Sequence, residues 1–343
     1  MNVLFVGGSN LVIKNGLSTI IPKILRDSGL DIENTYNISV GATTTLFGLE
    51  SLSLFIKKDV DLIFIEYGIN DLPLFVNDKA LWDAAFTSLL SLVAKKYPSA
   101  HIVTILLGRQ KDRFWNSQKK MHQRMREISN NFNALIVDID SHLKNKRESL
   151  SNFSDFYLDE SHYKSPSVTG YISQTIVSDY LLNKELGYFR APPSRNTSES
   201  LSVYGISGAV SSFENSRFHK QTTILEKENS VEVFVKGNPV GISFISASDS
   251  CSLLIESEGL KKIINTKRKK STAGKFSFIL KQIPLYGFYK KDTSKKDVRK
   301  IKLTALDNGS KLWDADAVQR TYGMEPASKD SKGSVYISHI SSF

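Results

Sequence analysis

Hydrophobic and polar positions follow two different patterns, one in the first 190 residues and another beyond residue 200. In the first part, short apolar runs are separated by longer stretches with helical spacing. The run from Asp61 to Tyr67 (DLIFIEY) has the near-continuous apolar character of a parallel strand buried on both faces. Short apolar runs predict strands at residues 3–6, 31–40, 61–67, 101–107 and 134–139.

Apolar residues at helical spacing separate these strands. They predict helices through residues 20–25 and over 80–96, 121–132 and 167–183, the second of which is stopped by Pro98. Strands that alternate with helices form a parallel sheet covered on both faces. Residues 1–190 are therefore predicted to form a three-layer α/β domain.

The pattern changes at Ala191-Pro192-Pro193-Ser194, where a segment rich in Pro, Ser, Asn and Thr (191–200) is typical of a linker. Beyond it, short strands recur about every 8–12 residues, with alternation such as Val231, Val233 and Val235. They are predicted at residues 222–226, 231–236, 241–246, 252–256, 261–265, 275–280 and 300–304. Residues 201–307 therefore predict a β-sandwich, and the polar, weakly periodic residues 308–343 predict a tail or a docking arm.

Composition restricts the class of protein. Hydrophobic residues make up 41% and charged residues 23%, which is ordinary for a soluble globular protein. No apolar run approaches the ~20 residues that span a bilayer. Met1 leads directly into a strand rather than into a basic and then apolar secretion signal, so we expect a cytoplasmic protein. The single cysteine, Cys251, offers no disulfide and no metal cluster.

Positive charge is concentrated in the C-terminal part. Residues 1–194 hold 21 Lys and Arg against 20 Asp and Glu, whereas residues 195–343 hold 24 against 15. The densest stretch comprises Lys261, Lys262, Lys267, Arg268, Lys269 and Lys270, with further lysines at 290–291 and 295–300. This is either a solvated charged hairpin or a surface for an anionic partner such as an acidic glycan. Nucleic acid is the least favoured partner, because few aromatic residues accompany the lysines.

Three glycine-containing segments follow predicted strands, and the carboxyl ends of parallel strands are where α/β proteins bind ligands. Gly7-Gly8-Ser9-Asn10 follows the first strand and places Ser9 at the start of a helix, as a nucleophile or as a simple helix cap. Asn70 follows the third strand, as an oxyanion donor or as a turn residue. Gly41, after the second strand, offers a backbone N–H to the same oxyanion.

A base for Ser9 is found just before the last predicted helix. In Asp159-Glu160-Ser161-His162, two intervening residues allow a tight loop to bring the carboxylate of Asp159 to the imidazole of His162. Glu160 is the alternative carboxylate. Ser9, His162 and Asp159 are thus predicted to act as nucleophile, base and orienting acid.

Four blocks, in this order, resemble the SGNH hydrolases, also called the GDSL family: Gly7-Gly8-Ser9, Val40-Gly41-Ala42-Thr43-Thr44, Gly68-Ile69-Asn70-Asp71 and Asp159-x-x-His162. The resemblance covers about residues 1–188. It implies a flavodoxin-like sheet, Ser9 as nucleophile, and an oxyanion hole made by the N–H groups of Ser9 and Gly41 and the side chain of Asn70. The chain departs from the family pattern at Gly8, where Asp is usual, and at Asn10, where an apolar residue is common.

The loop after the fourth strand opens onto the same sheet edge. There Arg109 and Arg113 are candidates to hold an anionic group of the substrate, and Trp115 is a candidate to stack on a sugar ring. The alternative is a solvated basic loop. No lid-like apolar segment of the kind expected in a lipase is present in the sequence.

The leading hypothesis from these features is an esterase or O-acetyltransferase that acts on a carbohydrate through acyl-Ser9. Hydrolysis needs no cofactor, and a transferase would draw on a donor such as acetyl-CoA. The contrasting hypothesis is a non-catalytic protein that binds or assembles glycans on the same scaffold, for which the departure at Gly8 is the support.

Overall fold

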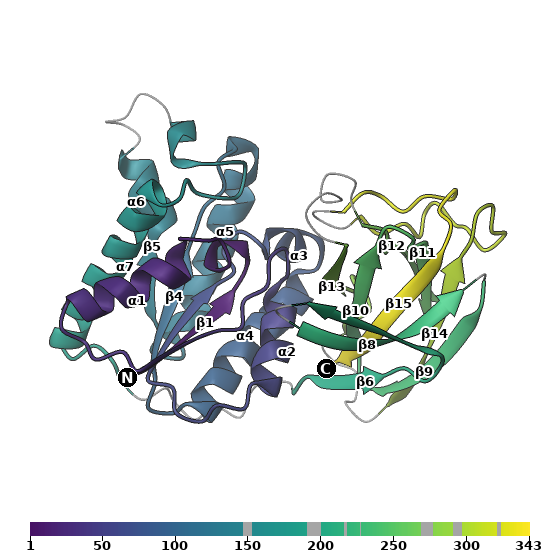
Figure 1. Cartoon of the computed structure of the whole chain (residues 1–343), viewed down its shortest axis with the longest axis horizontal. Coiled ribbons are helices and arrows are strands. Elements are labelled where there is room, and N and C mark those ends of the chain that lie inside the picture. The colour runs from purple at the N-terminus through teal and green to yellow at the C-terminus, as the bar shows by residue number, and fades with distance from the viewer. Residues whose placement is uncertain are drawn as a thin grey trace. The chain divides into compact units, whose positions relative to one another are not determined.

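The chain folds into two compact units, Met1–Glu199 and Ser200–Phe343 (Figure 1). This computed structural model describes residues 1–146, 153–190, 200–215, 218–226, 228–268, 277–290, 297–320 and 324–343. Most of the predicted linker, residues 191–199, lies outside the described residues, as do Lys269 and Lys270 of the basic stretch and the further lysines Lys291, Lys295 and Lys296.

The first unit is built on a five-stranded parallel sheet with the order β2-β1-β3-β4-β5. Its strands are β1 (Asn2–Gly7), β2 (Asn34–Asn37), β3 (Leu62–Glu66), β4 (His101–Leu106) and β5 (Leu135–Asp138). Every residue of β3 is buried, as expected for the apolar run in the middle of the sheet. This is the flavodoxin-like order, in which ligands bind where the direction of winding reverses, between β1 and β3.

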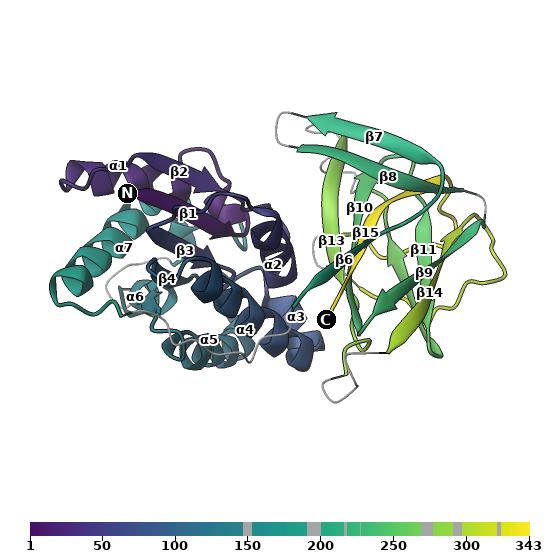
Figure 2. The same cartoon turned by 90° about the horizontal axis from the view of Figure 1, so that it is seen from below.

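Helices cover both faces of this sheet (Figure 2). They are α1 (Leu17–Asp27), α2 (Thr45–Leu54), α3 (Leu72–Asn77), α4 (Lys79–Lys96), α5 (Trp115–Asn130), α6 (Ile139–Lys146) and α7 (Ser167–Glu185), with 3-10 turns η1 (Ser9–Leu11), η2 (Asp112–Phe114) and η4 (Phe153–Phe156). Apolar residues of α1, α6 and α7 share one core with the sheet. Helices α2, α4 and α5 lie over the opposite face (Figure 2).

Two of these helices show how far the local sequence specifies an element. In α4, Asp78 caps the first turn by accepting a hydrogen bond from the Leu81 N–H (3.0 Å), and the predicted helix 80–96 is present almost unchanged. Helix α2 was not predicted, because apolar residues surround it and leave no amphipathic period. Its own N-cap, Thr44, makes no side-chain cap hydrogen bond.

The second unit consists of antiparallel strands in two sheets. One has the order β13-β10-β15-β8-β7, with β6 also paired to β15, and the other has the order β12-β11-β14-β9. The strands are β6 (Ser202–Gly205), β7 (Val210–Asn215), β8 (Phe218–Glu226), β9 (Ser230–Lys236), β10 (Pro239–Ala247), β11 (Ser252–Ser257), β12 (Leu260–Asn265), β13 (Phe278–Pro284), β14 (Val298–Leu306) and β15 (Ser334–Ser342). Inward-facing residues of both sheets, such as Phe244 and Leu303, form one core. The predicted order of an α/β domain and then an all-β domain is confirmed.

Residues 308–343 were predicted to be a polar tail or a docking arm, and the tail is wrong at its end, where residues 334–342 form β15 in the middle of the larger sheet. There β15 pairs with β10 on one side and with β8 and β6 on the other. Val335, Ile337 and Ile340 of this strand lie in the core of the unit. The serines between them made the segment look polar, but their backbone groups are satisfied by the neighbouring strands.

No helix among the described residues is long and apolar enough to cross a membrane.

Candidate active site

The order of the strands brings three of the predicted residues to one edge of the sheet. β1 lies between β2 and β3, and all three run in the same direction. Ser9 begins η1 two residues after β1, Gly41 lies in the turn that follows β2, and Asn70 follows β3. The carboxyl ends of adjacent parallel strands are neighbours, so these three residues gather at the point where the sheet reverses its winding.

Ser9, His162 and Asp159 form a continuous hydrogen-bonded series. His162 Nε2 lies 2.8 Å from Ser9 Oγ, and His162 Nδ1 lies 2.7 Å from Asp159 Oδ2. A carboxylate only accepts hydrogen bonds, so Nδ1 carries the proton of the neutral imidazole and Nε2 is left to accept the Ser9 hydroxyl hydrogen. Partial burial raises the pKa of Asp159, but hydrogen bonds from His162 and from the Ser161 N–H outweigh it and hold that pKa below its usual value.

The loop that carries Asp159 and His162 is anchored by two buried tyrosines at its ends. Tyr157 and Tyr163 form an antiparallel bridge, and their rings stack with centroids 4.6 Å apart. Both hydroxyls donate to the carbonyl of Gly108, at 3.0 and 2.9 Å, and the Gly108 N–H donates to Tyr163 (3.0 Å). The loop from Tyr157 to Tyr163 is thereby tied to the loop after β4, which restricts the motion of His162.

Asn10 adds a direct link between the turn that carries Ser9 and the loop that carries Asp159 and His162. Its Nδ2 donates to the Ser161 carbonyl at 3.1 Å, and the side chain is buried. An apolar residue at this position would leave that carbonyl without this donor. The departure of Asn10 from the family pattern therefore supplies a contact that holds Ser9 and His162 in register.

Gly8 is explained by the position of Asn70. A Cβ added at Gly8 would lie 2.5 Å from both Cγ and Oδ1 of Asn70, closer than a Cβ can approach. A Cβ at Gly41 would lie 3.6 Å from the Ser9 Cβ, an ordinary contact. The missing side chain at Gly8 is thus what allows the carboxamide of Asn70 to lie against the serine turn.

Three N–H donors at this edge have no hydrogen-bond partner within the part of the chain that the structure describes: the backbone N–H of Ser9, that of Gly41 and the Asn70 carboxamide. The neighbouring residue Ala42 has a left-handed backbone (φ 56°), which turns the chain sharply after Gly41. Donors held open by a rigid turn are suited to stabilise a developing oxyanion.

Two buried carboxyl groups lie behind this edge. Burial, together with repulsion from Asp71, raises the pKa of Glu66 to about 8. Burial also raises the pKa of Asp71 to about 7, although hydrogen bonds from Thr45 and Trp82 oppose the rise. Asp71 accepts from the Thr45 N–H (2.8 Å), from the Thr45 hydroxyl and from the Trp82 indole N–H (2.9 Å).

Arg109 does not take the position predicted for it. Its side chain is 1% exposed, and Nη2 donates to the Ile69 carbonyl at 3.1 Å, next to Asn70. The guanidinium also lies 4.9 Å above the ring of Phe114. This burial argues against contact between Arg109 and substrate, because the charge is directed at the protein's own backbone.

The other residues of this loop have mixed outcomes. The Trp115 indole N–H donates to the Arg109 carbonyl (2.9 Å), and the ring faces the Lys144 ammonium at 4.6 Å. Arg113 remains exposed and pairs with Glu160 at 3.4 Å, while Lys111 also binds Glu160. Glu160, the alternative orienting acid, is thus engaged by the loop after β4, and Asp159 is the carboxylate at the imidazole. Substrate contacts by Arg113 and Trp115 stay predictions.

Gln118, which was not predicted from the sequence, connects the loops after β3 and β4. This buried side chain donates to the carbonyls of Gly68 (2.9 Å) and Leu107 (3.1 Å) and accepts from the Arg109 N–H (2.9 Å). No local signal could have identified it, because it is one polar residue among many on α5. The two tyrosines that flank Asp159 and His162 could have been predicted more easily, because an aromatic residue on each side of a short loop indicates an anchored turn.

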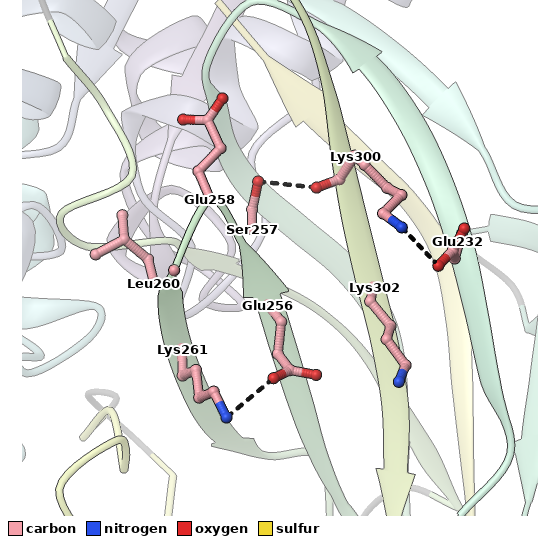
Figure 3. A pocket seen from close by; sticks show the side chains of 9 residues that line it. Glu232, Glu256, Ser257, Glu258, Leu260, Lys261, Lys300 and Lys302 are labelled. Carbon is pink, nitrogen blue, oxygen red and sulfur yellow. Dashed lines mark hydrogen bonds and ion pairs between the residues drawn. The ribbon is translucent and has the colours of Figure 1, made fainter.

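The second unit contains a groove of about 260 Å³ on the sheet formed by β12, β11, β14 and β9 (Figure 3). Glutamates and lysines line it in equal number: Glu232, Glu256 and Glu258 with Lys261, Lys300 and Lys302. Lys300 pairs with Glu232 (3.1 Å) and Lys261 with Glu256 (3.2 Å), while Lys302 is opposite both glutamates in strand register. Cross-strand pairing of this kind neutralises the lysines, so this groove does not supply the anion-binding surface predicted for the domain.

Within the described ranges, no three His, Cys, Asp or Glu side chains come together as a metal site requires. The fold and the site together define the class: a flavodoxin-like α/β unit with a hydroxyl, an imidazole and a carboxylate in series beside open N–H donors. Serine esterases and proteases on unrelated folds use the same geometry.

Comparison with known proteins finds similarity in the fold but not in the sequence. No family model and no curated protein sequence matches the chain. Among solved structures, a two-domain esterase (CEX) active on acetylated mannans, co-crystallised with mannopentaose, is similar over 100% of this chain and 90% of that one, with a TM-score of 0.67 and 14% identity. A second structure of a two-domain esterase (CEX) active on acetylated mannans has a TM-score of 0.64 at 13% identity, over 100% and 91% of the two chains. The resemblance inferred from the motifs is therefore confirmed at the level of the fold.

Proposed function

We propose that this chain is a serine esterase that removes acetyl groups from an O-acetylated carbohydrate through an acyl-Ser9 intermediate. The observation that carries the proposal is the hydrogen-bonded series from Ser9 through His162 to Asp159. Its position beside the open N–H groups of Ser9 and Gly41 and the Asn70 carboxamide supports acyl transfer over other uses of a reactive serine.

In the first half-reaction, Ser9 Oγ attacks the ester carbonyl carbon while His162 Nε2 accepts the hydroxyl proton. The carbonyl oxygen becomes an oxyanion, and the three N–H donors stabilise it. As the intermediate collapses, the bond to the sugar oxygen breaks, and His162 returns the proton to that oxygen. Asp159 remains ionised and stabilises the imidazolium throughout.

In the second half-reaction, water takes the place of the sugar hydroxyl. His162 accepts a proton from water as its oxygen attacks the acetyl carbon of acyl-Ser9, and the same donors stabilise the second oxyanion. Collapse releases acetate and regenerates the Ser9 hydroxyl with the proton held by His162. None of these steps requires a cofactor.

The carbohydrate part of the proposal is supported by similarity of fold over the whole chain, including the second unit, to a two-domain esterase active on acetylated mannans. The first unit contains Ser9, His162 and Asp159, which carry out the proposed acyl transfer. We assign recognition of the carbohydrate polymer to the appended β-unit, because the fold similarity to that two-domain esterase extends over this unit as well.

The test of Ser9 is its reaction with a fluorophosphonate probe. We expect one adduct per chain on wild type, mapped to Ser9, none on Ser9→Ala, and normal labelling of Ser53→Ala, which removes an exposed serine of α2. A wild-type chain that stays unlabelled while a reference serine esterase is labelled would overturn the enzyme proposal and favour a binding protein.

The test of the substrate is acetate release from acetylated mannan, acetylated xylan and 4-nitrophenyl acetate. We expect release from at least one acetylated polysaccharide and its loss in Ser9→Ala. Adding mannopentaose or acetyl-CoA distinguishes the outcomes: acetyl transfer to the oligosaccharide in preference to water would replace esterase with transferase. Activity on 4-nitrophenyl acetate alone would refute the carbohydrate assignment.

A further inference from the structure

The carboxylate of Asp71 caps α2 and not α3, the helix that Asp71 itself begins. Asp71 is the N-cap of α3, and its backbone carbonyl accepts from the Phe75 N–H (2.8 Å), but its carboxylate makes no cap hydrogen bond to α3. The carboxylate reaches instead to Thr45, the first residue of α2, whose own N-cap contributes no side-chain hydrogen bond. A residue 26 positions away in sequence thus caps α2.

This cross-cap joins the two segments that carry the oxyanion donors. Asp71 directly follows Asn70, and Thr45 is four residues after Gly41. The turn between Gly41 and Thr45 is itself stiff, because Ala42 is left-handed and the Thr43 hydroxyl donates to the Val40 carbonyl at 2.6 Å. Fixing Thr45 therefore fixes the Gly41 N–H relative to the Asn70 carboxamide.

The contact is shielded from water. Asp71 and Thr45 are fully buried, and the third donor to the carboxylate, the Trp82 indole N–H, is buried as well. In such surroundings a hydrogen bond is strong, because no water competes for the donor or the acceptor. The two segments are thus joined by hydrogen bonds from which solvent is excluded.

We propose that Asp71 is a positioning residue of the oxyanion hole: through Thr45 it holds the Gly41 and Asn70 donors at the separation that the oxyanion requires. This inference rests on the proposed esterase function. Asp71 touches neither the nucleophile nor the substrate, so its effect falls on the transition state, where both donors must act together, and not on ground-state binding.

The principal variant is Asp71→Asn, with Asp78→Asn as the matched control. Asp78 also accepts a hydrogen bond at a helix N-terminus, from the Leu81 N–H of α4, the helix that it caps. With 4-nitrophenyl acetate we expect Asp71→Asn to lower kcat about 10²-fold with KM unchanged, the scale of a misplaced catalytic donor. Asp78→Asn is expected to retain the wild-type kcat.

Two further measurements separate positioning from folding. Thr45→Val removes only the hydroxyl donor and keeps the N–H, so we expect kcat to fall about tenfold, the rate equivalent of one hydrogen bond, with a folded circular-dichroism spectrum. A boronic acid that forms a tetrahedral adduct with Ser9 should bind each variant more weakly in proportion to its kcat/KM.

The outcomes are distinct from failure of the esterase proposal, which would appear as an unreactive wild type. If wild type is active and the folded fraction of Asp71→Asn and Thr45→Val has the wild-type kcat, Asp71 only stabilises the fold and the inference is wrong. The same holds if KM rises while kcat is unchanged.

Discussion

The contact between Gly8 and Asn70 leads to a prediction about the smallest possible side chain. Gly8 has φ −94° and ψ −155°, an extended conformation that any L-residue adopts, so Gly8→Ala adds no backbone strain. The new Cβ would lie 2.5 Å from Cγ and Oδ1 of Asn70. Because the backbone does not need to change, the carboxamide of Asn70 is the group that must move.

The size of the effect follows from the role of the displaced group. Loss of one oxyanion donor costs about 10²–10³ in kcat, or ~3 kcal/mol of transition-state stabilisation. Overpacking a site by one methyl group costs ~1–3 kcal/mol of folding free energy, which a folded enzyme tolerates. We therefore expect Gly8→Ala to lower kcat about 10²-fold while the chain stays folded.

The assay is acetate or 4-nitrophenol release at saturating substrate, with thermal unfolding followed in parallel. Gly170→Ala is the matched control, because a Cβ at this α7 position meets nothing within 4 Å. It should keep the wild-type kcat and gain up to ~1 kcal/mol of stability by reducing the entropy of the unfolded chain.

The double variant Gly8→Ala/Asn70→Ala tests the route of the effect. If Gly8→Ala acts by displacing Asn70, the double variant should be no slower than Asn70→Ala alone. A wild-type kcat for Gly8→Ala would refute the steric reasoning. Losses that multiply in the double variant would show that Gly8 acts through another group.

Three further outcomes are expected. Asp159→Asn should lower kcat about 10⁴-fold at nearly unchanged Tm, because an amide cannot hold the imidazole in the required tautomer as a carboxylate does; a loss below tenfold would contradict this role. Asn10→Leu should reduce the free energy of unfolding by about 1–3 kcal/mol in urea titrations, because it removes the buried hydrogen bond to the Ser161 carbonyl, whereas Asn34→Leu at an exposed position should change it little. Burial holds the pKa of Glu66 at about 8, above its unfolded value of 4.5, so its stabilising contribution is complete below pH 4.5 and is lost as pH rises through 8. Tm should therefore fall between pH 5 and pH 9, Glu66→Gln should flatten that fall, and the exposed control Glu33→Gln should leave it unchanged.

The catalytic candidates could be found from the sequence because each lies within a few residues of a local signal. Ser9 and Asn70 follow apolar strands directly, and Asp159 and His162 share one short loop. Such local signals are enough to predict the site, because residues that follow parallel strands lie at the same edge of the sheet.

Elements whose stability comes from distant partners were not predictable in the same way. Strand β15 has serines where a central strand usually has apolar residues, and only pairing with β10, β8 and β6 makes it a strand. Arg109 is similar: a basic loop predicts an exposed guanidinium, yet the carbonyl of Ile69, 40 residues earlier, draws it inside. A partner at that separation leaves no trace in the local pattern.

The sequence by itself determined the class of each unit and the identity of the serine, the histidine and its acid, because these depend on periodicity and on short spacings. Tertiary structure alone decided how the site is held. The Asn10 bond to Ser161, the Asp71 cap on Thr45 and the space that Gly8 leaves for Asn70 all join segments that are distant in the sequence. The physical reason is separation along the chain. Hydrophobic periodicity depends on neighbouring residues in the sequence, whereas these hydrogen bonds and steric contacts join residues that only the folded chain brings together.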